Sequence, residues 1–235
     1  MMLRISVLGL AVAALAFTAR PAGAFTLDFV AEAAGLERAF SSETFLNAGG
    51  STIDVTAMAR ALSDGSGSYT TAPPYGYLDD LSGGKDGGFG VCPTDDCEGS
   101  PEDNISLNEV GILEFDSVVE ITSISFSNGD HNDVYSGTIG IHTGATNPTT
   151  AAGFNNPINT ATLVNGVLGP ISLISDRFQF LAPESFGRAR GETLKIYVSS
   201  VTFQGAPPIP EPSGALLYGL GVLGLLAAGR RRRRD

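Results

Sequence analysis

The chain carries two cysteines, Cys92 and Cys97, with four residues between them. In an oxidising compartment this spacing predicts a local disulfide that fixes its own loop. The loop is short, so its expected contribution lies below the roughly 3 kcal/mol of a 15-residue loop. No histidine or further cysteine accompanies the pair, and the spacing is not C-x-x-C. We therefore expect neither a thiolate metal site nor a redox pair.

Acidic and amide side chains surround the cysteines, between Tyr75 and Phe115. Calcium takes about six to eight oxygen ligands from carboxylates, Asn side chains and loop carbonyls, which this stretch offers. The preferred ligands are Asp103, Asn104 and Glu109, because they lead directly into a predicted strand that can hold them in place. The alternative is a solvated acidic loop, since no EF-hand pattern is present. The side chains concerned are Asp79, Asp80, Asp86, Asp95, Asp96, Glu98, Glu102, Asp103, Asn104 and Glu109.

A second polar group, Asn128 to Asp133, reads Asn-Gly-Asp-His-Asn-Asp. It offers ligands for a cation or a sugar, but these are also the residues that turns prefer. His131 has no second imidazole nearby with which to hold a transition metal. We therefore expect a solvated hairpin turn. His142 ends a predicted strand and is expected to be a surface or half-buried strand residue.

Catalytic patterns are weak, and we predict no enzyme. Gly65-Ser66-Gly67 resembles part of a nucleophile elbow, but it does not lie between a strand and a helix and is better interpreted as a flexible turn. Glycosidase chemistry needs two carboxylates across a cleft, and the many acids here select no pair. The chain has no tryptophan, so stacking on a sugar would fall to its tyrosines.

The charge of the chain excludes some partners. Between Phe25 and Ile209 there are 7 Lys or Arg and 23 Asp or Glu, a net charge of 7 − 23 = −16, against −11 for all 235 residues. Nucleic acid and anionic membrane surfaces attract basic patches, so we expect neither as a partner of this part of the chain. An acidic surface suits cations, but the favoured interpretation is self-repulsion that keeps the protein soluble.

Short alternating apolar runs between turn residues predict an all-β domain. Glu109 to Phe115 and Val118 to Phe126 flank Asp116-Ser117, and we interpret them as a hairpin. The one predicted helix spans Phe29 to Phe40. The elements together favour an antiparallel β-sandwich, either jelly-roll or immunoglobulin-like. Other strands are predicted at Ser51 to Ala61, Tyr75 to Leu78, Val134 to His142, Ile171 to Leu181 and Thr193 to Phe203.

Both ends of the chain carry targeting patterns. Met1 to Arg4 form a positive n-region, Ile5 to Phe17 an apolar h-region, and Ala22-Gly23-Ala24 a small-residue cleavage site, which predicts a secretory signal peptide over residues 1–24. At the other end, an apolar run of 16 residues, 214–229, follows a Pro-rich entry and precedes Arg230 to Arg234. A helix of this run reaches about 24 Å, short of a bilayer core of roughly 30 Å. Snorkelling arginines allow it to span.

The C-terminal order of Pro210-Glu211-Pro212, a short apolar helix and an arginine cluster resembles the PEP-CTERM sorting tail. The resemblance implies processing by an exosortase at the inner membrane of a Gram-negative bacterium that makes exopolysaccharide. The membrane anchor would then be transient. Arg230, Arg231, Arg232, Arg233 and Arg234 would stay in the cytoplasm by the positive-inside preference. An ordinary C-terminal anchor is the alternative.

These patterns predict three parts: the signal peptide 1–24, a secreted β-sandwich domain 25–206, and a sorting tail 207–235 with a transmembrane helix 214–229. The favoured function is a non-enzymatic exported protein of the cell surface or exopolysaccharide matrix, with exosortase as its processing partner and calcium as a stabilising ion. The alternative is a secreted carbohydrate-binding or carbohydrate-active module. That alternative rests on fold analogy alone.

Overall fold

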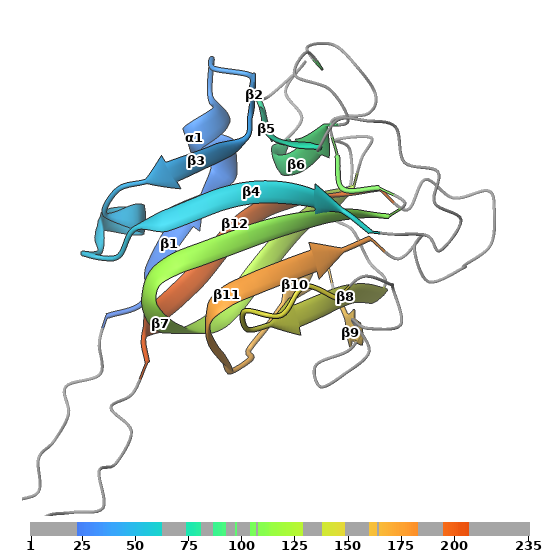
Figure 1. Ribbon diagram of the computed structural model, residues 1–235. Coiled ribbons are helices and arrows are strands. Elements are labelled where there is room, and N and C mark those ends of the chain that lie inside the picture. The colour runs from blue at the N-terminus through green and yellow to red at the C-terminus, as the bar shows by residue number, and fades with distance from the viewer. Residues whose placement is uncertain are drawn as a thin grey trace, which may run out of the picture.

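A computed structural model describes ten stretches of the chain, and the fold is built from these residues. They comprise twelve strands and two short helical turns (Figure 1). The stretches are residues 23–62, 74–80, 87–92, 97, 104–106, 108–128, 138–148, 160–163, 165–182 and 195–206. The strands are β1 (Phe25–Asp28), β2 (Arg38–Phe40), β3 (Ser42–Phe45), β4 (Val55–Ala61), β5 (Tyr75–Asp79), β6 (Gly88–Cys92), β7 (Glu109–Asn128), β8 (Thr138–Thr143), β9 (Thr160–Thr162), β10 (Val167–Leu168), β11 (Leu173–Leu181) and β12 (Ile196–Gly205).

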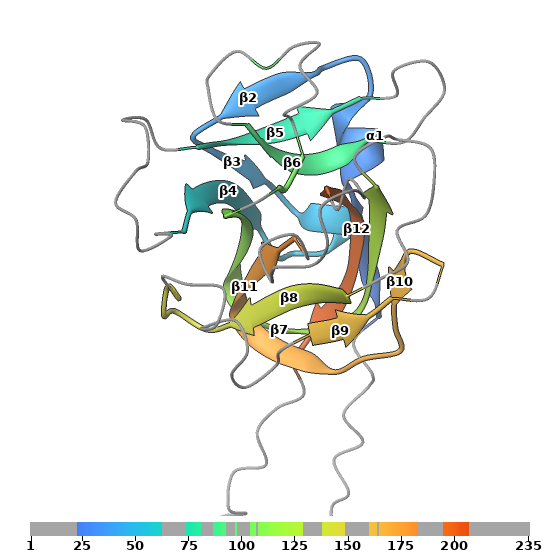
Figure 2. The same ribbon diagram turned by 90° about the vertical axis from the view of Figure 1, so that its right-hand side faces the viewer.

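The strands form one hydrogen-bonded sheet in which neighbouring strands run antiparallel. The main path is β2-β5-β6-β12-β7-β11-β8-β9. β1 adds to β12, β10 adds to β7, and β4 joins the first half of β7 with β3 beyond it. This arrangement confirms the predicted all-β antiparallel class. Figure 2 shows the sheet wrapped around its interior, with β5 and β6 at the top of the view and β8 and β9 at the bottom.

β7 is the long central strand, and it corrects the predicted hairpin around Asp116-Ser117. Residues 109–128 form a single strand of 20 residues. β11 pairs antiparallel with both halves, through Leu181 opposite Val110 and Leu173 opposite Ile121. The two halves therefore belong to one continuous strand that bends sharply, and no pairing in the described residues joins them to each other as a hairpin. Asp116 and Ser117 are exposed where β7 passes from β4 to β12, so turn-forming residues mark a bend here.

The core lies between the two halves of β7 and their partners. Phe115 in the first half packs edge-on against Phe203 of β12, with ring centroids 5.1 Å apart. Phe126 in the second half packs against Phe180 of β11, at 6.0 Å. These contacts join strands that lie on different stretches of the curved sheet. Burying these aromatic side chains adds to the hydrophobic driving force for folding.

A bulge in β7 shifts the pattern of core-facing residues by one position. Val119 and Ile121 are buried, and after them the buried residues become Ile124 and Phe126, a shift of one position. The pairing with β12 shifts at the same place, between Thr202 and Phe203. One extra residue in a strand reverses which side chains face inward, so the bulge accounts for the broken alternation of the sequence.

The strand predictions that fall on described residues hold with changed boundaries, whereas the predicted helix from Phe29 to Phe40 is wrong at its end, where Arg38–Phe40 form β2. β4 starts at Val55 rather than Ser51, and β11 and β12 lie where strands were predicted. The predicted helix is much shorter, because α1 spans only Phe29–Ala33. The Asp28 side chain caps it by accepting from two backbone N–H groups, and Gly35, with φ 71°, ends it. The other short turn is η1 (Ala48–Gly50).

Both targeting segments lie almost entirely outside the described residues, since these run from residue 23 to residue 206. This applies to the predicted transmembrane helix, residues 214–229, and to the arginine cluster. Within the described stretches, no helix has the length and apolar character that crossing a bilayer requires.

Candidate functional site

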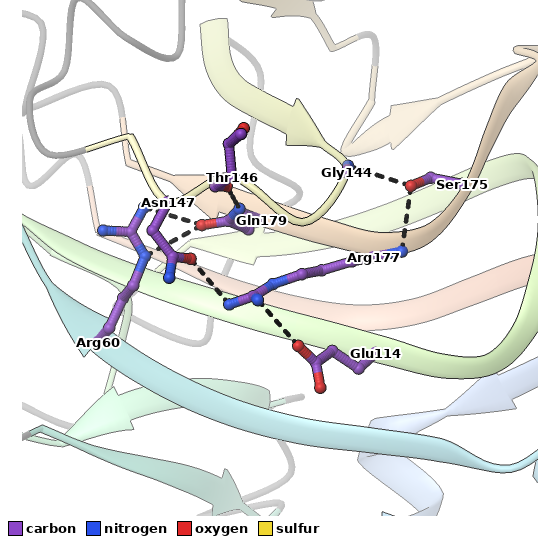
Figure 3. Close-up of polar contacts among 8 residues, drawn as sticks. All are labelled: Arg60, Glu114, Gly144, Thr146, Asn147, Ser175, Arg177 and Gln179. Atoms are coloured by element: carbon purple, nitrogen blue, oxygen red, sulfur yellow. Dashed lines mark hydrogen bonds and ion pairs between the residues drawn. The ribbon is translucent and has the colours of Figure 1, made fainter.

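The candidate site is a polar cluster on the outer face of β4, β7, β11 and β8 (Figure 3). Strand pairing places its members in neighbouring rows across the sheet. Gln179 of β11 lies opposite Ile112 of β7 on one side and His142 of β8 on the other. Arg177 lies opposite Glu114 in the next row. Arg60 comes from β4, on the far side of β7. Side chains on one face of a sheet at these spacings reach each other.

Gln179 is the centre of the cluster and is fully buried. Its Oε1 accepts hydrogen bonds from Nε and Nη2 of Arg60, at 3.0 and 2.8 Å. Its Nε2 donates to the carbonyl of Thr146 at 2.7 Å. The side chain thus links the arginine of β4 to the segment that follows β8. Hydrogen bonds to a charged donor in a buried position are stronger than neutral ones in water.

Arg177 is held from two sides. Nη1 lies 3.0 Å from Oε1 of Glu114, and Nη2 donates to Oδ1 of Asn147 at 2.9 Å. The register of β11 shifts between Ser175 and Arg177. Ser175 Oγ accepts from the backbone N–H groups of Arg177 and Gly144, each at 3.1 Å. Nε of Arg177 is buried and has no hydrogen-bond partner among the described residues.

The charges of Arg60 and Arg177 make the cluster a positively charged region. Burial, and secondly the charge of Arg177, lower the pKa of Arg60 to about 10. Burial lowers the pKa of His142 from its usual 6.5, and the charges of Arg60 and Arg177 lower it further. His142 is 7% exposed, and its Nε2 shares a hydrogen bond of 2.8 Å with Oγ1 of Thr146. The neutral imidazole is therefore the favoured form here.

An apolar group adjoins the cluster on the same outer face. Leu62, Val110, Ile112 and Leu181 are buried there, and Met58 packs against them. Both faces of β7 are thus buried in its first half. An apolar surrounding weakens the screening of charges, so the guanidinium groups act strongly on one another and on any anion that approaches them. A guanidinium carries five N–H donors and a permanent positive charge, which is the chemistry that recognises an oxyanion.

The disulfide prediction is confirmed. Cys92, at the end of β6, is bonded to Cys97, with a Cα–Cα distance of 6.1 Å. Both cysteines are buried and pack with Tyr77 of β5. The bond therefore fixes the segment after β6 against the neighbouring strand.

The predicted calcium ligands are only partly described. Asp103 lies outside the described residues. Asn104 is fully buried, directly before a residue that bridges to β12. Oε2 of Glu109, the first residue of β7, accepts from the backbone N–H of Ser106 at 2.9 Å and also from its hydroxyl, which ties the start of β7 to the residues before it. Among the described residues, no three His, Cys, Asp or Glu side chains come together as metal ligands would. Calcium binding stays a prediction.

Two other sequence predictions fall largely outside the description. Residues 65–67 and 129–133 are among the undescribed ones, so neither the flexible turn nor the hairpin turn with His131 is tested. His142 is described, and it is more deeply buried than the surface or half-buried position expected from sequence.

Sequence reasoning missed the arginine cluster. One signal was present, because Gln179 is a lone polar residue between Phe178 and Phe180 in an apolar run. A polar residue in such a run indicates either an exposed face or a buried face with a dedicated partner. Its partner Arg60 is 119 positions away, so only the fold identifies it.

The fold and the cluster define an all-β protein with a buried, positively charged network on the outside of its sheet. Comparison of the chain with protein-family models, with curated proteins and with solved structures gives no match in any of the three.

Proposed function

We propose that this chain is a non-enzymatic exported protein of the cell surface or exopolysaccharide matrix, sorted by an exosortase. The observation that carries the proposal is the C-terminal order of Pro210-Glu211-Pro212, the apolar run 214–229 and the arginine cluster 230–234. The signal-peptide pattern at the other end supports it, because a C-terminal sorting tail acts only on an exported chain.

The geometry of the domain is compatible with a tail of this kind. β1 pairs with β12, and Phe25, the first residue after the predicted signal peptide, lies opposite Phe203. The last described residue, Ala206, donates its N–H to the carbonyl of Val118 at 3.3 Å. Both ends of the domain thus lie side by side on one edge of the fold (Figure 1). A domain tethered there would direct the ends of β4, β11 and the start of β7 away from its attachment.

We also propose that the domain is a β-sandwich of the jelly-roll rather than the immunoglobulin-like type. In an immunoglobulin-like domain the first and last strands lie in different sheets. Here the first strand, β1, is hydrogen-bonded to the last, β12. Cross-layer contacts such as Phe115 with Phe203 support two packed layers.

The test is the intact mass of the protein from the envelope and the medium of a host with and without an exosortase. We expect loss of residues 1–24 in both hosts, and loss of the tail near Pro210 only with the exosortase. A chain that stops after Ala206 serves as the matched control, because it should reach the medium in either host. A full-length tail in both hosts would mean a plain membrane anchor and would overturn the proposal.

The arginine cluster offers a second test. Replacing Arg230 to Arg234 by glutamine should weaken membrane orientation and processing, because cytoplasmic positive charge sets the orientation of a membrane helix. Protease protection in spheroplasts measures the orientation. An unchanged topology would contradict the sorting role of the cluster.

A further inference from the structure

Positive side chains are scarce in this domain, and two of them converge on one site. Of the 7 Lys or Arg between residues 25 and 209, two are Arg60 and Arg177. They come from different strands and lie within electrostatic reach of each other, since the charge of Arg177 lowers the pKa of Arg60. Burial and the charges of both arginines lower the pKa of His142. A domain with a net charge of −16 over those residues, from 7 − 23, therefore contains a local positive region.

The two guanidinium groups are held in fixed orientations. The Gln179 carbonyl oxygen engages Nε and Nη2 of Arg60 together. Glu114 and Asn147 engage the two Nη atoms of Arg177. Side chains with several rotatable bonds lose much entropy when a ligand orders them. Here the protein has already ordered them, which is the condition for tight recognition of a small charged group.

Holding two positive charges here costs free energy. Burial, and secondly the charge of Arg177, disfavour the charged form of Arg60. Glu114, the acid in contact with Arg177, is 38% exposed, whereas the Arg177 side chain is 16% exposed. A buried N–H of that guanidinium also has no partner among the described residues. An oxyanion nearby would offset the repulsion and supply acceptor oxygens.

We propose that Arg60 and Arg177 bind an oxyanion, a carboxylate or sulfate group, at the outer face of β4 and β11. Thr146 and Asn147 of the cluster are exposed. Asn147 contacts Arg177 directly. The anion has two possible sources, a free small anion or the acidic groups of a polysaccharide. The inference stands on the cluster alone and is independent of the sorting tail.

The first experiment is titration calorimetry on the full-length protein in a nonionic detergent at fixed ionic strength. The probes are sulfate, galacturonate, polygalacturonate and, as an uncharged control, galactose. We expect the anions to bind and galactose not to bind. Tighter binding of polygalacturonate than of galacturonate would identify an acidic saccharide as the ligand. Equal binding of sulfate and galacturonate, with no gain for the polymer, would identify a free small anion. Both results support an oxyanion site, whereas no heat from any anion would overturn it.

Variants tie the binding to the cluster. Arg177→Gln removes one guanidinium and should weaken anion binding about tenfold or more, as expected for loss of a charge-assisted hydrogen bond. Arg38→Gln is the matched control, because Arg38 is paired with Glu43 on β2 and β3, away from the cluster. If Arg177→Gln does not fold, Asn147→Asp keeps the arginines and puts a negative charge on the exposed side chain that contacts Arg177. It should weaken binding as well, and equal loss in Arg38→Gln would overturn the site.

Titration of His142 by NMR gives a readout that a merely structural cluster would not move. The chain has 2 histidines, so His131→Gln assigns both signals. A bound oxyanion counters the field of the two arginines, so the pKa of His142 should rise on adding galacturonate. Arg177→Gln should raise the pKa of His142 before any anion is added. A pKa of His142 that does not respond to saturating anion would overturn the proposal.

Discussion

The outer face of β7 differs between its two halves. In the first half, Val110 and Ile112 are buried on this face, beside the arginine cluster. In the second half the outer face consists of small hydroxyl and polar side chains that remain partly exposed. Ser123 there lies opposite Thr202, which in turn lies opposite Thr26 of β1.

The two faces differ in how their polar side chains are hydrogen-bonded. On the hydroxyl face, Thr26 and Thr202 share a hydrogen bond of 3.0 Å, and water is available if that bond breaks. On the buried face Gln179 is fully buried, so its own hydrogen bonds, to Arg60 and to the carbonyl of Thr146, are made within the protein. The buried face is therefore the one on which a single polar substitution should have large effects.

The largest effect should come from the inner face that both halves share. Phe203 is fully buried and packs against Phe115 and Phe25. Phe203→Ala should lower the free energy of unfolding by about 3–5 kcal/mol, because it removes buried apolar surface and leaves a cavity. Urea unfolding followed by circular dichroism measures the loss. A loss below about 1 kcal/mol would contradict a common core.

A pair of glutamines tests the contrast between the outer faces directly. Gln179→Ala removes the oxygen that accepts two hydrogen bonds from Arg60, and it also removes the bond to Thr146. It should lower the free energy of unfolding by about 2–3 kcal/mol. Gln204→Ala, on the hydroxyl face, removes one bond to Glu120. Its expected effect is about 0.5 kcal/mol or less, since exposed polar contacts contribute little. Equal losses in the two variants would remove the distinction.

The buried face should also respond to acid. The folded protein holds the pKa of His142 below its usual 6.5 through burial and the charges of Arg60 and Arg177. Because the unfolded chain binds a proton more readily, this contribution is fully present above about pH 6.5 and is lost as the pH falls through the folded pKa. Urea unfolding at pH 7.5, 6.5 and 5.5 should show a decline that His142→Gln reduces. An identical decline in both proteins would exclude His142 as its source.

The smallest effect is expected on the hydroxyl face. Thr26→Val keeps the β-branched shape and removes only the exposed hydroxyl bond to Thr202. The free energy of unfolding should change by less than about 0.5 kcal/mol. Thermal unfolding of both proteins at the same pH measures it. A larger loss would mean that this face is less well hydrated than its composition indicates.

Local patterns were sufficient to predict the disulfide and several strands. Cys92 and Cys97 are close in sequence, so little of the fold has to be known to pair them. β4 and β11 were readable because their inner positions are apolar and their ends carry turn residues. In each case the decisive information lies within a few residues.

The bend in β7 and the arginine cluster depend on contacts between distant parts of the chain. Asp116-Ser117 has the composition of a turn, and only the pairing of β11 with both halves shows that one strand continues through the bend instead of forming a hairpin. Arg177 and Glu114 are likewise brought together by that pairing. Turn propensity and alternation describe a strand's own residues, and they do not specify which strands become its neighbours.

The pairing of the first strand with the last has a consequence for when the domain can fold. β12 lies between β7 on one side and β1 and β6 on the other. These strands cannot be joined into one sheet through β12 until residues 196–205 are available. A chain that emerges N-terminus first must therefore wait for almost all of its length before β1 finds its partner. Such non-local pairing favours slow, late folding. For the export proposed above, the domain would complete its structure only at the end of its passage through the membrane, a timing suited to transport as an extended chain.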